Sequence, residues 1–392
     1  MPAANYVPSP HKLPHSVGLS LSGGGFRATL FHLGALRRLN EFGILPRLTT
    51  ISSVSGGSIL NGFLASRLPS PLSAGIGDFE RAVSQPLRQF CSRNLRRWLA
   101  LEMFVPGTHN SEGLAGQYDR NLTGGKSLAE IPDSPAHVFC STDLAYGVNW
   151  IFRKKLCGDY RAGYQDPDPR WTVGAAVAAS SCFPPVFKPM RLGLDPRRLT
   201  GGDVPSGPDR DKCIRGLTLS DGGVYDNLGL EPIWKNHETV LASDGGALFS
   251  TRGDTGPVWE VARYLAIPEN QALAVRKRWL IASFVSGQLH GTYWGIGSSP
   301  YDYGVQQGFA NDLVKNFIAA IRTDLDSFSE AEASVLENHG YWLADAAIRV
   351  HVPALLPNPV PPLAVPNPQW SGPPDKIKQA LAGSARRTLL GR

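Results

Sequence analysis

The sequence predicts an α/β fold: a mostly parallel central sheet flanked by helices, with a helical C-terminal section. Three observations support this prediction. Two successive units near the N-terminus each consist of an apolar strand, a glycine-containing turn and an amphipathic helix. Further strand-like runs end in Asp-Gly-Gly turns, and the last third of the chain has mainly helical periodicity. In a parallel sheet with crossover helices, functional groups collect at the carboxyl ends of the strands.

The first strand-turn-helix unit comprises a strand at 17–22 and a helix at 26–42, whose apolar residues recur at helical spacing. The second comprises a strand at 48–54 and a helix at 56–68, which stops before Pro69. Because the helices act as crossovers, we expect the two strands to lie parallel and both turns to open on the same edge of the sheet.

The middle of the chain is less regular. Residues 69–77, rich in Pro, Ser and Gly, open a section at 70–135 that we interpret as an insertion or lid. Strand patterns resume at 137–144 and 148–152. A helix of small residues follows within 171–187 and is ended by its Pro-Pro pair.

The C-terminal part contains two more predicted strands and then helices. After a loop at 191–213, the stretches 216–230 and 239–246 each contain a short strand that ends in Asp-Gly-Gly. The chain is then mainly helical to about residue 350, and Ser329 with Glu332 forms a capping box at the start of a helix.

This organisation predicts one principal domain. At 392 residues the chain has the length of large α/β enzymes that use one domain with insertions. We assign that domain to 1–350, of which 250–350 is the helical section. The remainder, 351–392, is a proline-rich tail that we expect to be extended.

Composition is typical of a globular protein without a membrane span. The chain is 42% hydrophobic and 18% charged, and no apolar run approaches the roughly 18 residues of a spanning helix. The N-terminal segment has no apolar stretch of the secretory type, so we expect a cytoplasmic protein unless a leader was removed. No CxxC pair occurs, which predicts free and mostly buried thiols at Cys91, Cys140, Cys157, Cys182 and Cys213.

The formal net charge of +6 has two interpretations. A scattered, solvated surface is favoured, and attraction to an anionic lipid surface is the alternative; we expect no nucleic-acid partner. The stretch 86–104 concentrates arginines among apolar residues: Arg88, Arg93, Arg96 and Arg97. This pattern is more typical of a lid or core helix with an exposed basic face, although an interfacial helix in peripheral contact with a membrane also fits it.

The turn after the second predicted strand, SSVSGGS at 52–58, contains a candidate nucleophile. A serine between a strand end and a helix resembles the nucleophile elbow, a tight turn of the form G-x-S-x-G that lifts a hydroxyl out of the sheet. Ser55 occupies that position, with Ser53 in place of the first glycine and Gly57 at the second. We expect the small Ser53 to leave the elbow intact, although such a turn alone is a weak signal.

The turn after the first predicted strand contains three successive glycines, Gly23, Gly24 and Gly25. An acyl-transfer enzyme must stabilise negative charge on the carbonyl oxygen, and a single well-placed donor is worth roughly 3 to 4 kcal/mol. Backbone N–H groups at the start of a helix suit that task, because glycine allows close approach and the helix dipole favours an anion. We therefore expect an oxyanion site at this turn.

A serine nucleophile needs a base, and none of the nine histidines lies in a predicted strand-end turn. Asp221 and Asp244 do lie at such positions. A carboxylate can act directly as the base if partial desolvation brings its pKa into a workable range. A Ser-Asp pair is therefore the economical interpretation.

Three motifs in this order resemble the patatin-like phospholipases, which share a catalytic core with the cytosolic calcium-activated phospholipases. They are SGGGFR at 22–27, SSVSGGS at 52–58 and SDGGVYDNLGL at 220–230. STDLAYG and AASSCFPPVF extend the resemblance over roughly 15–245, and RTDLDSFSEAEASVLENHGY is similar to the C-terminal helices of bacterial members.

The resemblance implies a role for each motif. Ser55 would be the nucleophile and Asp221 the other half of a Ser-Asp dyad, while the three glycines and Arg27 would form the oxyanion site. Asp221 is preferred to Asp244 because only Asp221 precedes the VYDNLGL run. We expect Asp244 to be a strand-end or cap residue, and Arg27 can equally be an ordinary helix-surface arginine.

The implied activity is that of a lipid acyl hydrolase of the phospholipase A or lysophospholipase type, which cleaves carboxylic esters through an acyl-enzyme intermediate on Ser55. Its partner would be a lipid or phospholipid substrate. We expect no cofactor or metal, because no cluster of His, Cys and carboxylates has ligand spacing. Two alternatives stay open: a catalytically idle lipid-binding scaffold, and a Ser-His-Asp esterase that uses His290 or His339.

Two nucleotide-binding alternatives fail on context. Gly23, Gly25 and Ala28 fit G-x-G-x-x-A, but the acidic residue of that fold ends the second strand, whereas Glu41 ends the preceding helix. The sequence GGKS at 124–127 lacks the earlier glycine of a phosphate-binding loop.

Overall fold

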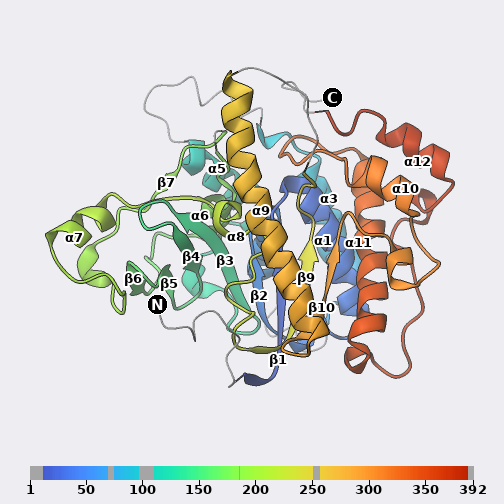
Figure 1. Ribbon diagram of the computed structural model, residues 1–392, viewed down its shortest axis with the longest axis horizontal. Coiled ribbons are helices and arrows are strands. Elements are labelled where there is room, and N and C mark those ends of the chain that lie inside the picture. The colour runs from blue at the N-terminus through green and yellow to red at the C-terminus, as the bar shows by residue number, and fades with distance from the viewer. Residues whose placement is uncertain (1–11, 69–74, 97–109, 185, 250–256, 387–392) are drawn as a thin grey trace.

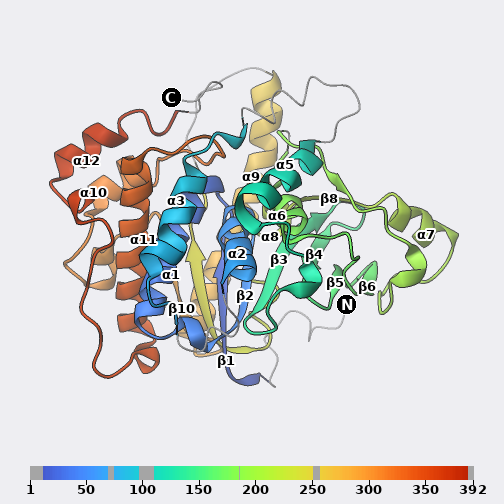
Figure 2. The same ribbon diagram turned by 180° about the vertical axis from the view of Figure 1, so that it is seen from behind.

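A central sheet with helices on both faces forms the body of the protein (Figures 1 and 2). The computed structural model describes residues 12–68, 75–96, 110–184, 186–249 and 257–386. The strands are β1 (Leu13–Leu21), β2 (Leu48–Ser53), β3 (Ala136–Asp143), β4 (Val148–Phe152), β5 (Cys157–Asp159), β6 (Gly163–Gln165), β7 (Met190–Arg191), β8 (Thr218–Asp221), β9 (His237–Asp244) and β10 (His290–Gly295). The helices are α1 (Gly25–Glu41), α2 (Gly56–Arg67), α3 (Gln85–Cys91), α5 (Asn110–Tyr118), α6 (Val173–Ser181), α7 (Pro208–Arg215), α8 (Gly223–Asp226), α9 (Pro257–Val285), α10 (Asn311–Leu313), α11 (Glu330–His351) and α12 (Pro374–Leu381).

The strands of the described residues form one sheet in the order β10-β9-β1-β2-β3-β4-β5-β6, with β8 paired to both β3 and β7. The five strands from β10 to β3 are parallel. The next three strands, β4 to β6, are antiparallel to their neighbours, and so is β8 against β3. The predicted mostly parallel sheet with flanking helices is confirmed.

The two N-terminal strand-turn-helix units lie side by side as predicted. β1 and β2 pair in parallel, with Leu21 opposite Ser53. The backbone N–H groups of Val54 and Gly57 donate to the carbonyls of Leu21 and Ser22, at 3.0 and 3.1 Å. The glycine turn and the serine turn therefore meet at one edge of the sheet.

Helices cover the two faces unequally. α9 runs across one face in Figure 1, and α1, α2 and α3 lie in front of the sheet in the reverse view of Figure 2. α11, which begins with the predicted capping box of Ser329 and Glu332, packs along α1 and against β10. A fully buried ion pair joins α1 to α11, where Arg38 Nη2 lies 2.7 Å from Asp345 Oδ1. Such a pair requires both partners, since a lone buried charge is strongly unfavourable.

Several elements differ from the sequence-based expectations. The predicted helical section contains the strand β10, and the predicted loop at 191–213 contains the start of α7. These differences arise from long-range pairing, which local periodicity does not report. The helix of small residues, α6, ends at Ser181, as expected of a helix followed by Pro184 and Pro185, which have no N–H to donate to the carbonyls of residues 180 and 181.

The proline-rich segment at 352–375 has little regular structure, but it is anchored to the body. Asn338 of α11 exchanges hydrogen bonds with the backbone of Asn367, at 2.8 and 2.9 Å. Arg88 of α3 also donates to the side chain of Asn367 and pairs with the buried Glu337 of α11 at 2.6 Å. Arg88 of the arginine-rich stretch at 86–104 is thus packed against the protein, and residues 97–104 lie outside the described residues.

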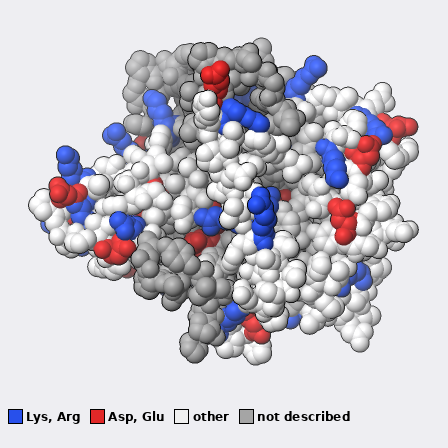
Figure 3. All heavy atoms as spheres, in the orientation of Figure 1, with Lys and Arg blue, Asp and Glu red and all other residues white. Residues whose placement is uncertain are grey.

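Charged side chains of the described residues form no single large patch on the face shown in Figure 3. Figure 3 shows basic and acidic side chains scattered among uncharged residues on the face that carries α9. Within the described ranges, no helix combines the length and apolarity that a membrane crossing requires. The five cysteines are free, and all except the exposed Cys213 are buried, as expected.

Candidate active site

Ser55 forms a strained turn between β2 and α2. Its backbone has φ 48° and ψ −114°, a conformation that non-glycine residues rarely adopt. This is the geometry expected of a nucleophile elbow, in which the turn presents the hydroxyl at the sheet edge. The strain persists because the surroundings determine it: the Ser55 N–H donates to both the carbonyl and the hydroxyl of Ser180 on α6, at 3.1 and 2.9 Å.

The residues around Ser55 explain why the elbow tolerates a serine in place of its first glycine. The Ser53 hydroxyl donates to the Val138 carbonyl at 3.1 Å and accepts hydrogen bonds from Ser58 and Asn61. Its side chain is therefore satisfied inside the sheet. The two positions that follow Ser55 do require glycine, because a Cβ at Gly56 or Gly57 would collide with backbone carbonyls of the first strand-turn unit.

The glycine turn places free donors beside Ser55. Gly24 and Gly25 have φ values of 142° and 58°, which glycine adopts without strain. Within the described residues, their N–H groups have no acceptor, and both residues line the same cavity as Ser55. The N–H of Gly23, by contrast, donates to the Asn227 carbonyl at 3.0 Å. Of the three glycines predicted as oxyanion donors, Gly23 is therefore already committed to the protein.

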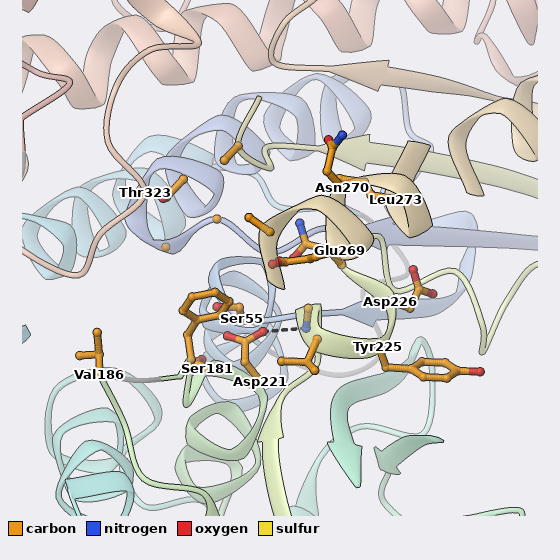
Figure 4. Close-up of a pocket in the computed structure, with 18 of the residues that line it drawn as sticks. Ser55, Ser181, Val186, Asp221, Tyr225, Asp226, Glu269, Asn270, Leu273 and Thr323 are labelled. Carbon is orange, nitrogen blue, oxygen red and sulfur yellow. Dashed lines mark hydrogen bonds between the residues drawn. The ribbon is translucent and has the colours of Figure 1, made fainter. Parts of the chain in front are cut away.

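Asp221 reaches this edge from the opposite direction to the parallel strands. β8 runs antiparallel to β3, and Asp221 lies opposite Ser141 of β3. On the other side of β3, Phe139 lies opposite Ser53 at the end of β2, so Asp221 is two residues beyond the end of β2. The strand thus enters over the carboxyl edge of the sheet and ends at the elbow. Figure 4 shows the side chain of Asp221 beside Ser55.

The carboxyl group of Asp221 has the properties of a base. Burial raises its pKa to about 7, against the opposing effects of a 2.7 Å hydrogen bond from the Gly223 N–H and a side-chain hydrogen bond with Ser55. The negative charge of Glu269 on α9 raises the pKa further. A carboxyl that titrates near neutral pH is well suited to accept and return a proton.

These groups share a cavity of about 390 Å³. Its wall combines the polar groups above with apolar side chains, among them Phe183, Val186, Phe187, Leu248 and Leu273. Figure 4 shows Glu269, Asn270 and Leu273 of α9 above Ser55 and Asp221. An apolar cavity with a few convergent polar groups is the usual form of a small-molecule or lipid-chain site.

Arg27 and Asp244 lie near the site but in structural roles. The Arg27 guanidinium is buried and donates to the carbonyls of Gly245, Ala319 and Ile321, at 2.9, 3.1 and 2.7 Å, so it holds these segments behind the glycine turn. It is not among the residues that line the cavity. The sequence-based expectation of a direct oxyanion contact therefore has no support from its position.

Asp244 at the end of β9 is a paired carboxylate. Lys277 of α9 lies 2.5 Å away, and the Tyr293 hydroxyl and Gly246 N–H donate to it at 2.7 and 2.9 Å. Burial alone would raise its pKa, but the Lys277 charge and these hydrogen bonds outweigh burial and lower it. The expectation that Asp244 is a structural strand-end residue agrees with these contacts.

The histidines of the alternative triad lie elsewhere. His339 is buried in α11, where it contacts the Ile296 carbonyl at 2.9 Å, and burial lowers its pKa to about 4. His290 begins β10, opposite Thr239, at the far end of the strand from the edge that carries Ser55. Among the described residues, no histidine lines the cavity, and no three His, Cys, Asp or Glu side chains are grouped so as to hold a metal ion.

Some site residues were not predicted from the sequence. Ser180 belongs to the small-residue segment expected to pack beside the elbow, and its contacts confirm that packing. Arg96, Asp324 and Glu269 also line the cavity, but they come from segments interpreted only as an insertion and a helical section. No local pattern marks them as cavity residues, because their position depends on how distant segments fold over the sheet edge.

Comparisons with known proteins gave one matching family and several structures of limited similarity. A family model described as patatin-like phospholipase matches residues 19–234. No curated protein sequence matches the chain. Human GIVD cytosolic phospholipase A2 is structurally similar with 13% identity and a TM-score of 0.38, over 59% of this chain and 45% of that one. VipD from Legionella pneumophila is similar with 13% identity and a TM-score of 0.37, over 87% of this chain and 68% of VipD. The chain thus spans less than half the length of the human phospholipase.

Proposed function

The chain belongs to the patatin-like phospholipase family, and we propose that it is a lipid acyl hydrolase that cleaves carboxylic esters through a Ser55–Asp221 dyad. The observation that carries this proposal is the convergence of three groups in one cavity. These are a hydroxyl on a strained elbow, a buried carboxyl whose pKa is raised to about 7, and two glycine N–H groups without acceptors in the described chain.

In the first half of the proposed reaction, Ser55 Oγ attacks the ester carbonyl while Asp221 takes its proton. Negative charge develops on the carbonyl oxygen, which the N–H groups of Gly24 and Gly25 stabilise. The tetrahedral intermediate then collapses, its C–O bond breaks, and the leaving alcohol receives the proton from Asp221. The product of this half is an acyl-enzyme on Ser55.

In the second half, water attacks the acyl-enzyme and gives its proton to Asp221. The same glycine N–H groups stabilise the second oxyanion. Collapse returns the proton to Ser55 Oγ and releases the fatty acid. In this scheme Asp221 accepts and returns the proton in both halves of the reaction, so no histidine is needed as a base.

The rim of the cavity supports a lipid substrate and peripheral contact with a lipid surface. Phe183, Val224, Leu248 and Phe249 line the cavity and are also exposed, each by at least 40%. Exposed apolar side chains gathered around one cavity are typical of an interaction site. Co-sedimentation with phosphatidylcholine vesicles tests this contact, and Leu248→Ser with Phe249→Ser should weaken it.

The dyad is tested by fatty-acid release from mixed lipids together with labelling by a fluorophosphonate, which reacts with activated serines. The wild-type protein should release fatty acid and become labelled, and Ser55→Ala should lose both. Ser92→Ala, which changes an exposed serine at the end of α3, is the matched control and should behave as wild type. Labelling that survives in Ser55→Ala, or a wild-type protein without turnover, contradicts the proposal.

The triad alternative is separated by single replacement of His290 and His339. A triad loses activity by orders of magnitude when its histidine is removed. We expect His290→Gln to retain full activity. His339→Gln should retain it in proportion to the fraction that remains folded, since that side chain is buried in α11.

A further inference from the structure

Arg96 is a cavity-lining arginine whose guanidinium is only partly used by the protein. Its Nη1 donates to the carboxylate of Asp324. Its Nε and Nη2 are buried and have no hydrogen-bond partner among the residues that the structure describes. Buried charged donors are rarely left without a partner, because desolvation without compensation costs free energy. A ligand in the cavity would supply the missing acceptor.

The two open donors have a defined geometry. Nε and Nη2 lie on one edge of the planar guanidinium, and together they form the fork that binds two oxygens of a phosphate or carboxylate. The third nitrogen, Nη1, is held by Asp324, which fixes the plane of the group. The side chain is 15% exposed. It is therefore oriented by the protein at the cavity wall, and a ligand reaches Nε and Nη2 when the side chain shifts toward the cavity.

Arg96 is linked to the oxyanion turn through the backbone of the segment at 323–325. The N–H groups of Leu95 and Arg96 donate to the Leu325 carbonyl at 3.0 and 3.4 Å, and the Asp324 carbonyl accepts the Phe26 N–H at 2.9 Å. A Cβ on Gly25 would lie 2.5 Å from that same carbonyl. The arginine thus lies on the side of the cavity where the ester carbonyl would bind.

Other arginines near the site have partners in the protein. Arg276 donates to the Tyr225 carbonyl at 3.3 Å and lies 3.8 Å from both Asp226 and Glu231. Arg27 is committed to backbone carbonyls behind the glycine turn. Because Nε and Nη2 of Arg96 have no partner among the described residues, Arg96 is the best candidate of these three arginines for holding an anionic group of the substrate.

We propose that Arg96 binds the phosphodiester of a glycerophospholipid and thereby favours phospholipids over neutral glycerides as substrates. This inference rests on the proposed function, since it concerns the substrate of the same site. The carboxylate of the released fatty acid also has two oxygens that the Arg96 fork could bind. The fatty acid is therefore the second possible anionic ligand of Arg96.

The test compares two lipids with identical acyl chains, dioleoyl phosphatidylcholine and dioleoylglycerol, in the same detergent micelles. Arg96→Gln should lower kcat/KM for the phospholipid by about tenfold or more and change that for the glyceride less than about twofold. Arg96→Lys, which keeps the charge but loses the fork, should fall between. Arg93→Gln changes an exposed arginine in the same segment and should match wild type.

The outcomes separate the possible roles of Arg96. An equal loss on both lipids means that Arg96 acts only through Asp324 on the glycine turn, and it overturns the proposal. The proposal also fails if Arg96→Gln relieves product inhibition by oleate without changing the ratio of the two rates, because the anion is then the fatty acid.

A binding measurement keeps this inference distinct from the proposed function. Ser55→Ala should bind a fluorescent phosphatidylcholine analogue, and Ser55→Ala with Arg96→Gln should bind it about tenfold more weakly or worse. This difference does not depend on turnover, so it supports the role of Arg96 even if the wild-type protein hydrolyses neither lipid. Equal binding by the two variants contradicts it.

Discussion

The backbone N–H of Ser55 donates to both the carbonyl and the hydroxyl of Ser180, at 3.1 and 2.9 Å. This double contact ties the elbow to the end of α6 and holds Ser55 at a positive φ. It also removes the Ser55 N–H from the set of groups that can bind an oxyanion. The geometry of the proposed nucleophile thus depends on a residue 125 positions away in the chain.

The first prediction concerns that contact. The Ser180 hydroxyl also donates to the Cys140 carbonyl at 2.6 Å and lies 2.8 Å from the Ser58 hydroxyl. Ser180→Ala should lower kcat/KM by about 10- to 100-fold, because small displacements of a reacting group are costly. Steady-state fatty-acid release measures this loss. Ser283→Ala, which removes a buried hydroxyl that bonds only within α9, should leave activity unchanged; equal effects of the two variants would refute the prediction.

The second prediction concerns pH. Because Asp221 must be ionised to act as the base and its pKa is raised to about 7, kcat/KM should rise about tenfold per pH unit below 7 and level off above it. Glu269 raises that pKa by its charge, so Glu269→Gln should move the rising limb to lower pH. The pH profile of fatty-acid release measures the shift. Glu260→Gln changes an exposed carboxyl elsewhere on α9 and should not move the limb.

The third prediction concerns stability. The pKa of Asp221 is higher in the folded protein, about 7, than the roughly 3.9 of an unfolded aspartate. The unfolded chain therefore loses this proton first as pH rises from 4 to 7, and the folded state becomes less stable by on the order of 3 kcal/mol through this group. Asp221→Asn lacks the effect.

Urea unfolding of wild type and Asp221→Asn at several pH values measures this linkage. The free energy of unfolding of the variant, relative to wild type, should increase from pH 4 to 7 and stay constant above 7. Other titrating groups are common to both proteins and cancel in the difference. A difference that does not vary with pH would mean that the folded carboxyl titrates near its ordinary pKa.

The fourth prediction concerns the glycine turn. Gly25 and Gly43 have similar φ values, 58° and 66°, but a Cβ at Gly25 meets the Asp324 backbone whereas nothing lies within 4 Å of one at Gly43. Both alanine variants should lose about 1 kcal/mol of stability from the backbone conformation. Only Gly25→Ala should also lose activity, by about 100-fold, because the oxyanion donors are displaced.

Thermal unfolding and fatty-acid release on the two alanine variants separate these effects. Gly43→Ala serves as the control for strain without crowding. If it loses activity as severely as Gly25→Ala, the loss reflects general destabilisation and not the position of the donors.

Local sequence patterns were sufficient to predict the two strand-turn-helix units that carry the N-terminal half of the candidate site. The strand-turn-helix units around Gly24 and Ser55 each lie within about 25 residues, and periodicity together with glycine placement predicted both, including their shared edge. The run that follows Asp221 distinguished it from Asp244. Because these features depend on neighbours in the chain, they can be inferred without knowledge of the remaining fold.

Other features depended on contacts between distant segments. β10 lies within the section for which the sequence predicts mainly helices, yet it pairs with β9. Asp221 lies at the end of an antiparallel strand. The N–H of Gly23 donates to the Asn227 carbonyl, and the Arg27 guanidinium donates to the carbonyls of Gly245 and Ile321. Each outcome is decided by which partner is within hydrogen-bonding distance, and no sequence spacing specifies that distance.

The sequence by itself determined the class of fold and the candidate Ser55, because strand and helix periodicity and turn chemistry are local properties of the chain, and the resemblance of its motifs to a known family selected Asp221 over Asp244. Only the tertiary structure decided the working environment of those residues. The burial of Asp221, the acceptors taken by Gly23 and Arg27, and the position of Arg96 on the cavity wall follow from segments that fold over one sheet edge. Desolvation and hydrogen bonding act through space, so they appear only once the chain is folded.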